Sequence, residues 1–197
     1  MKNRFFLVIA TVAAVALMTS CGKVPQANID SANAAIDSAK TVQADIYLPG
    51  DFAALNDSMT VIIQSIEAQK SKLFKSYKTP KAKLIALEAQ AKTVAGNAVV
   101  KKEEVKKEAE TLLASVKQLL ADNTALLAKA PRGKEGKAVL EEIKGELTVI
   151  ETSINEAQTL FDAGTNYMQV LDKVKAAKES LTGIKTELEE AIAKVRR

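Results

Sequence analysis

Apolar residues recur every three or four positions along most of this chain, which is the spacing of one face of an α-helix. The pattern predicts helices at about 29–47, 51–78 and 80–129, followed by a C-terminal helical hairpin at 137–197. No alternating pattern typical of β-strands competes with it. The predicted fold is therefore all-α, built from elongated antiparallel helical hairpins with coiled-coil character.

Two apolar stripes carry most of this prediction. The second helix has a stripe consisting of Phe52, Leu55, Met59, Ile62, Ile66 and Leu73. The third helix has a seven-residue repeat consisting of Leu84, Ala91, Ala98, Val105, Leu112, Leu119 and Leu126. Such narrow stripes bury well only along a seam, and only eight of the 197 residues are aromatic, so we expect no thick globular core.

Helix-breaking residues set the boundaries between these elements. Leu48-Pro49-Gly50 is expected to end the first helix, with Asp51 as the N-cap of the second. Thr79 and Pro80 are expected to cap and start the third helix, since proline fits a first helical turn. Residues 130–136 predict a linker, and Gly164 predicts the turn of the C-terminal hairpin, with Thr165 or Asn166 as the cap.

The first 21 residues have the pattern of an export signal. Lys2 and Arg4 precede an uncharged apolar run, small or neutral residues follow, and the stretch from 5 to 20 is shorter than the ~20 residues that span a bilayer. Residues 1–20 are thus expected to be a signal peptide and 21–28 a tether. A retained helix, or an ordinary signal that leaves a free thiol, stays open as an alternative.

The end of this run, Leu17-Met18-Thr19-Ser20-Cys21, resembles the lipobox of bacterial lipoproteins. The resemblance implies that Cys21 receives a diacylglyceryl group, becomes the first residue after cleavage and carries fatty-acyl chains such as palmitate. It also implies sorting, because an aspartate after the cysteine retains many such proteins at the inner membrane. Gly22 stands there, so we expect a lipid anchor in the outer membrane that faces the periplasm.

Two further resemblances concern the helices. The residues that carry the first are Pro25, Ile29, Ala32, Ile36, Ala39, Ala44, Tyr47-Leu48-Pro49 and Phe52. They resemble a family of uncharacterised bacterial envelope lipoproteins, in which an alanine-rich helix runs into a Tyr-Ala-Pro turn. Leu48 departs from that pattern, and the resemblance implies an anchored helical domain of unknown role. Gly164-Thr165-Asn166-Tyr167 resembles the turn of a tetratricopeptide hairpin, with one extra residue.

Composition narrows the possible functions. Of the 28 basic side chains, Lys2 and Arg4 lie in the signal, which leaves 26 against 24 acidic ones, a balance that argues against nucleic-acid binding. The chain has no histidine, and acylation would block Cys21, so we expect no enzyme, no cofactor and no metal site. Paired glutamates such as Glu103-Glu104 and Glu141-Glu142 are interpreted as solvated helix faces.

Charge is distributed unevenly along the chain. Val24 to Gln69 carries one lysine and six acids, whereas Lys70 to Lys107 carries eleven lysines and three acids. The lysines around the Thr79-Pro80 joint are Lys70, Lys72, Lys75, Lys78, Lys81 and Lys83. They are interpreted either as ordinary solvated lysines or as a site for an anionic envelope ligand such as a lipid headgroup, lipopolysaccharide or cell-wall polymer.

Two functional hypotheses follow. In the first, the chain is a lipid-anchored periplasmic scaffold of the cell envelope that binds a partner protein or another copy of itself. In the second, it is a binding module that holds an anionic ligand through the lysines of residues 70–83.

Overall fold

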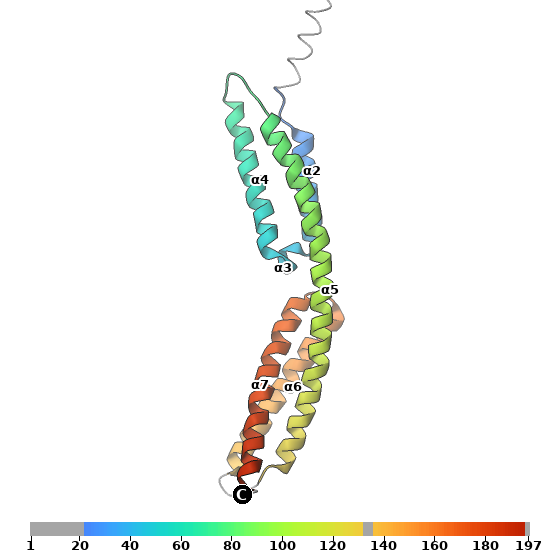
Figure 1. The fold of residues 1–197 in the computed structure, drawn as a ribbon, viewed down its shortest axis with the longest axis vertical. Helices are drawn as coiled ribbons and strands as arrows, with labels where there is room; N and C mark the ends of the chain where they lie inside the picture. Colours follow the sequence, from blue (N-terminus) through green and yellow to red (C-terminus); the bar gives the residue numbers. More distant parts are fainter. Residues whose placement is uncertain (1–21, 132–135, 196–197) are drawn as a thin grey trace, which may run out of the picture. The chain divides into compact units, whose positions relative to one another are not determined.

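The structure, a computed structural model, describes residues 22–131 and 136–195, and every regular element within those ranges is a helix. The elements are α2 (Gln26–Thr41), α3 (Ala44–Tyr47), α4 (Pro49–Lys70), α5 (Lys78–Lys129), α6 (Gly136–Ala163) and α7 (Tyr167–Val195), shown in Figure 1. The all-α prediction is confirmed. None of the helices in the described part of the chain is both long and apolar enough to cross a bilayer.

The chain forms two compact units, which divide within α5 between Lys101 and Lys102. Unit 1 contains α2, α3, α4 and the first part of α5, and unit 2 contains the rest of α5 with α6 and α7. The sequence pattern instead predicts the boundary between the two helical regions at the 130–136 linker. That segment does separate α5 from α6, but the packing on either side of it belongs to one unit.

In unit 1 the three long helices α2, α4 and α5 run alternately up and down (Figure 1). Their apolar faces share one core, which consists mainly of Ala32, Ala35, Ile36, Ala39, Leu55, Met59, Ile62, Ile66, Leu84, Leu87, Ala91, Val94 and Ala98. The first part of α5 thus buries the 84, 91 and 98 positions of the predicted heptad repeat. Val24, before the start of α2, also packs against this core.

The helix predicted over 29–47 is two helices. The backbone of Gln43 is left-handed, with φ of 65°, so α2 ends at Thr41 and the short α3 begins at Ala44. The Gln43 amide donates to the Lys40 carbonyl oxygen at 2.8 Å, which closes the last turn of α2. A non-glycine residue in this conformation carries a steric cost, and no glycine in the sequence marked the break.

The boundaries of the second helix also differ from the prediction. α4 starts at Pro49, where proline fits the first turn, rather than after an Asp51 cap. It ends at Lys70 rather than near 78, and residues 71–77 form a loop before α5 begins at Lys78. Leu73, which the sequence placed on the buried stripe, therefore lies outside the helix.

The heptad repeat predicted along α5 holds only in its first half. Leu84, Ala91, Ala98 and Val105 are buried, but Leu112, Leu119 and Leu126 are only half-buried. The buried positions that follow Val105 are Ala109, Leu113, Val116, Asn123 and Ala130. An α-helix with 3.6 residues per turn drifts by about 20° per heptad, so over the six heptads from Leu84 to Leu126 the heptad positions rotate by about 120° and leave the buried stripe.

Unit 2 packs α6 and α7 against each other and against the second part of α5. Its core consists of Val105, Ala109, Leu113, Val116, Ile143, Leu147, Ile154, Ala157, Tyr167, Val170, Leu171, Val174, Ala177, Leu181, Ile184 and Leu188. Polar side chains also connect the helices. Lys175 pairs with Glu108 at 3.0 Å, Lys173 pairs with Glu156 at 2.9 Å, and the Lys117 ammonium donates to Gln158 Oε1 at 2.8 Å.

The turn between α6 and α7 follows the prediction. Gly164 has φ of 67° after the last residue of α6, and its amide donates to the Phe161 carbonyl oxygen at 3.0 Å. Asn166, one of the two expected caps, accepts a hydrogen bond from the Gln169 amide at 3.2 Å. The centroids of the Phe161 and Tyr167 rings lie 5.3 Å apart across the turn, so aromatic packing connects the end of α6 to the start of α7.

Candidate functional site

The loop between α4 and α5, residues 71–77, is tied down at both of its ends. On the α4 side, Ile66 is buried, and the Lys72 amide donates to the Gln69 carbonyl oxygen at 3.2 Å. On the α5 side, Tyr77 is buried in the core of unit 1, and its carbonyl oxygen accepts from the Lys81 amide at 2.9 Å. The middle of the loop is thus held between two anchored ends.

Two large apolar side chains lie in the middle of this loop. Leu73 is 91% exposed and Phe74 is 88% exposed, the highest values among the exposed large hydrophobic residues of the described chain. Neighbouring hydrophobic residues that are this exposed typically mark an interaction site. Scattered single residues, such as Val149 in α6, need no such explanation.

The structure places the six predicted lysines at the same end of unit 1. Lys72 and Lys75 lie in the loop on either side of Leu73 and Phe74, and all six lysines are exposed. Lys70 and Lys78 lie at the flanking helix ends, while Lys81 and Lys83 lie in the first turns of α5. Lys70 pairs with Glu67 at 2.6 Å, an exposed ion pair of small energetic value. No acidic residue occurs from 68 to 87, so the loop is locally basic.

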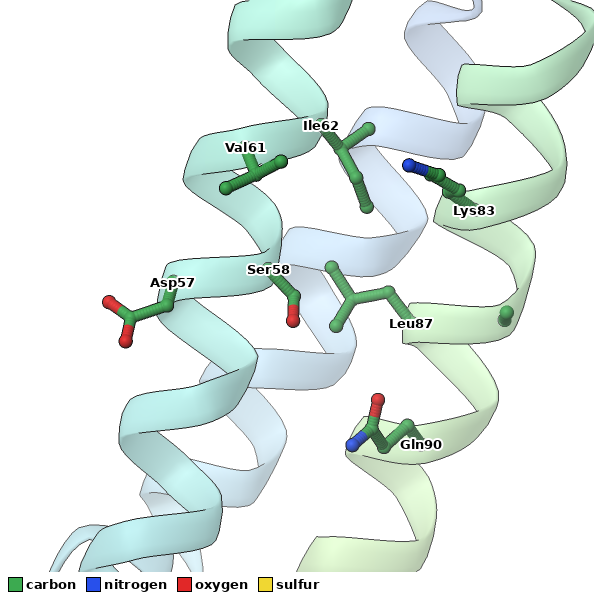
Figure 2. A pocket seen from close by; sticks show the side chains of 8 residues that line it. Asp57, Ser58, Val61, Ile62, Lys83, Leu87 and Gln90 are labelled. Carbon is green, nitrogen blue, oxygen red and sulfur yellow. The ribbon is translucent and has the colours of Figure 1, made fainter.

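A groove of about 420 Å³ runs between α4 and α5 further along unit 1. It is lined by Asp57, Ser58, Val61 and Ile62 of α4 and by Lys83, Ala86, Leu87 and Gln90 of α5. Figure 2 shows Ile62 and Leu87 pointing toward each other at its base, while Asp57 points away from α5. Of the six lysines, Lys83 is the one that lines this groove.

The α4–α5 loop lies at the same end of unit 1 as the beginning of α2 (Figure 1). This follows from the alternating helix directions, because α2 starts, α4 ends and α5 starts at one end of the bundle. α2 begins at Gln26, only a few residues beyond Cys21. Cys21 itself lies outside the described residues.

The glutamates considered in the sequence do not gather into a site. Glu103, Glu104, Glu141 and Glu142 are exposed on helix surfaces, and so are Glu187, Glu189 and Glu190 near the end of α7. Within the described ranges, no three histidine, cysteine or acidic side chains lie close enough together to hold a metal ion. Their arrangement favours interaction with solvent and with nearby lysines, as in the Lys144–Glu141 pair at 4.0 Å.

Sequence reasoning found the lysines but missed the exposed apolar pair between them. Leu73 follows Ile66 by seven residues and so continued the stripe of the second helix. A signal was nevertheless present, because Ser71 and Ser76 bracket the pair and serine is a weak helix former that favours turns.

Comparison with known proteins found no match among protein-family models, curated proteins or solved structures. The resemblances to the envelope lipoprotein family and to a tetratricopeptide hairpin therefore stay predictions from the sequence.

Proposed function

We propose that the chain is a lipid-anchored helical scaffold of the bacterial cell envelope, attached through Cys21 and facing the periplasm, with protein interaction rather than catalysis as its role. The observation that carries the proposal is the short distance in sequence between Cys21 and the folded bundle. Val24 already packs on the core of unit 1, and α2 begins at Gln26. An acyl group at Cys21 would thus hold unit 1 directly at a membrane surface.

The outer membrane is the proposed location, because Gly22 rather than aspartate follows the cysteine. The groove between α4 and α5 supports the interaction role. It combines an apolar base at Ile62 and Leu87 with a half-exposed Val61 at its edge, and such a surface suits a partner helix or a second copy of the chain.

The anchor is tested by replacing Cys21. In the full chain expressed in bacteria, Cys21→Ala should leave an uncleaved precursor and abolish labelling by an alkynyl fatty acid. Ser20→Ala is the matched control, because a small residue before the cysteine preserves the resemblance to a lipobox, and labelling should continue. Normal maturation and membrane fractionation of the Cys21→Ala chain would refute the anchor.

A second candidate function is the binding of an anionic envelope ligand by the lysines of residues 70–83. It is favoured by their placement in and around one loop with no acidic residue among them. Isolation of the tagged full chain from detergent-solubilised envelope separates the two functions. A defined protein partner supports the scaffold, whereas lipid or glycan that is lost at high salt supports the anionic-ligand site.

A further inference from the structure

We infer that the α4–α5 loop is a membrane contact: Leu73 and Phe74 insert into the surface layer of an anionic phospholipid bilayer, and the lysines around them bind lipid phosphates. This inference deepens the second candidate function and rests on it for the role of the lysines. Of the possible anionic ligands it names one, the bilayer itself.

The apolar side chains supply the first argument. Leu73 and Phe74 are adjacent and almost fully exposed, although Tyr77 of the same loop is buried. The loop thus keeps one aromatic residue for the core and presents another to solvent. Aromatic and aliphatic side chains beside lysines are typical of segments that lie in the membrane interface. Transfer of each side chain out of water favours the bound state by roughly tenfold or more.

Charge supplies the second argument. Lys72 and Lys75 flank the apolar pair in sequence, and Lys70 and Lys78 lie at the adjoining helix ends. Each lysine close to an anionic membrane strengthens binding by about fivefold. A protein partner would need its own acidic rim around an apolar pocket. An anionic bilayer offers phosphates above a hydrocarbon layer everywhere on its surface.

The position of the loop supplies the third argument. The loop and the start of α2 lie at the same end of unit 1 (Figure 1). The chain from Cys21 to Gln26 spans at most about 18 Å when fully extended, from ~3.6 Å per residue. If Cys21 is acylated as proposed, the same bilayer lies within reach of the loop. Only this third argument depends on the anchor.

The test uses tryptophan, which the chain lacks, as a probe of insertion. Full-length Phe74→Trp protein, matured in the bacterial envelope and purified in detergent, is reconstituted into vesicles of phosphatidylglycerol with brominated phosphatidylcholine. We expect the tryptophan emission to shift to shorter wavelength and to be quenched by the bromine atoms. Val149→Trp is the matched control at an exposed site on α6, and its emission should stay unquenched.

The lysines are tested in the same Phe74→Trp chain. Lys72→Gln with Lys75→Gln should weaken insertion by about 25-fold, at about fivefold per charge. In this variant, quenching should disappear at a lower salt concentration than in the Phe74→Trp chain that keeps both lysines. Lys137→Gln with Lys144→Gln removes the same charge from exposed positions on α6 and should leave quenching unchanged. All of these substituted positions are exposed, so circular dichroism should report an unchanged fold for each variant.

Two outcomes would overturn the inference, and polyphosphate binding then decides whether the anionic-ligand function is refuted with it. If bromine quenches the tryptophan at position 74 no more strongly than the one at position 149, the inferred insertion is refuted. Cross-linking of a benzoylphenylalanine at position 74 to a protein, rather than to phospholipid, in intact cells also overturns it. Insertion can fail while polyphosphate still binds the original chain and no longer binds the chain with Lys72→Gln and Lys75→Gln. In that case the anionic-ligand function survives without the membrane contact. If polyphosphate binding also fails, both proposals are refuted.

Discussion

The two units reach a similar three-helix arrangement with different cores. In unit 1, α2 buries three alanines, Ala32, Ala35 and Ala39, with one isoleucine. In unit 2, α7 buries larger side chains, namely Val170, Leu171, Val174, Leu181, Ile184 and Leu188. Small residues allow two helix backbones to approach closely but remove little apolar surface from water, whereas each buried leucine or valine contributes roughly 1.5–3 kcal/mol.

The difference indicates how each unit is stabilised. Unit 1 depends on close packing along α2, where Ala32 and Ala39 are fully buried, so we expect added volume to be costly. Unit 2 depends on the burial of large side chains, where removed volume leaves a cavity. Unit 2 also fixes its helices with polar contacts, among them the buried Asn123, whose side-chain amide donates to the Leu181 carbonyl oxygen of α7 at 2.7 Å. We therefore expect unit 1 to be sensitive to added side-chain volume along α2 and unit 2 to be sensitive to removed volume along α7.

The absence of tryptophan allows each unit to be followed separately. Phe52 packs partly buried against the core of unit 1, and Phe161 is partly buried against Tyr167 in unit 2. Phe52→Trp and Phe161→Trp thus provide one fluorescent reporter chain for each unit. Urea unfolding of the two reporter chains serves as the reference for the predictions below.

The largest effect is expected from Leu181→Ala in unit 2. Leu181 is fully buried, so its truncation should lower the free energy of unfolding by about 2–5 kcal/mol through lost burial and the cavity left behind. Leu73→Ala is the matched control, since Leu73 is 91% exposed and its truncation should change stability by less than about 0.5 kcal/mol. We expect a larger shift in the Phe161→Trp reporter chain than in the Phe52→Trp reporter chain, and equal shifts would show that the two units unfold together.

Overpacking should reveal the tight fit of α2. Ala32 is fully buried, and Ala32→Leu should destabilise unit 1 by about 1–3 kcal/mol because the neighbouring helices must move apart. Ala34→Leu makes the same change on the exposed side of α2 and should be nearly neutral. Both changes are measured in the Phe52→Trp reporter chain. A stabilised Ala32→Leu chain would mean that the seam of α2 has unused space.

A third prediction concerns the helix turns, since unit 1 places Gln43 and unit 2 places Gly164 in the left-handed region. Gly164→Ala should cost about 1–2 kcal/mol, because an alanine is strained in the left-handed backbone conformation, with φ of 67°. Gly145→Ala within α6 meets no atom within 4 Å and should instead stabilise by about 0.5–1 kcal/mol. In the Phe161→Trp reporter chain, Gly164→Ala should lower the free energy of unfolding and Gly145→Ala should raise it. Changes of the same sign would contradict the role we assign to the left-handed backbone at Gly164.

The smallest effect is expected at Asn123. Its Oδ1 atom is buried and makes no hydrogen bond to any described residue, while its amide makes one bond to α7. In Asn123→Leu, the removal of a buried polar group offsets the lost hydrogen bond, so stability should change by no more than about 1 kcal/mol. Asn123→Ala also leaves a cavity and should be clearly less stable than Asn123→Leu. The reverse order would show that the fit of the side chain at this position matters less than we infer, since the smaller residue would then be the better replacement.

Part of the candidate site was predictable and part was not. The concentration of lysines from Lys70 to Lys83 is a property of composition and needs no fold. The exposure of Leu73 and Phe74 depends on where α4 stops. That point is set by the loop that returns the chain, since Tyr77 and Leu84 must reach the core beside Ile66. Apolar periodicity alone predicts a helix that continues through Leu73.

By itself the sequence determined the features that arise from local interactions. Helical periodicity made the fold all-α, and Gly164 with Asn166 set the α6–α7 turn, because glycine conformation and capping depend on a few neighbouring residues. The lysine-rich stretch was likewise visible. These features need no knowledge of which helices meet.

Only the tertiary structure decided the features that depend on a partner helix. The break at Gln43 needs surrounding contacts to offset its strained backbone. The drift of the heptad positions out of the buried stripe of α5 accumulates over more residues than a short sequence window covers. Asn123 is buried because α7 offers the Leu181 carbonyl oxygen to its amide. The physical reason is common to all three: burial is a property of pairs of elements, whereas a periodic pattern describes one element.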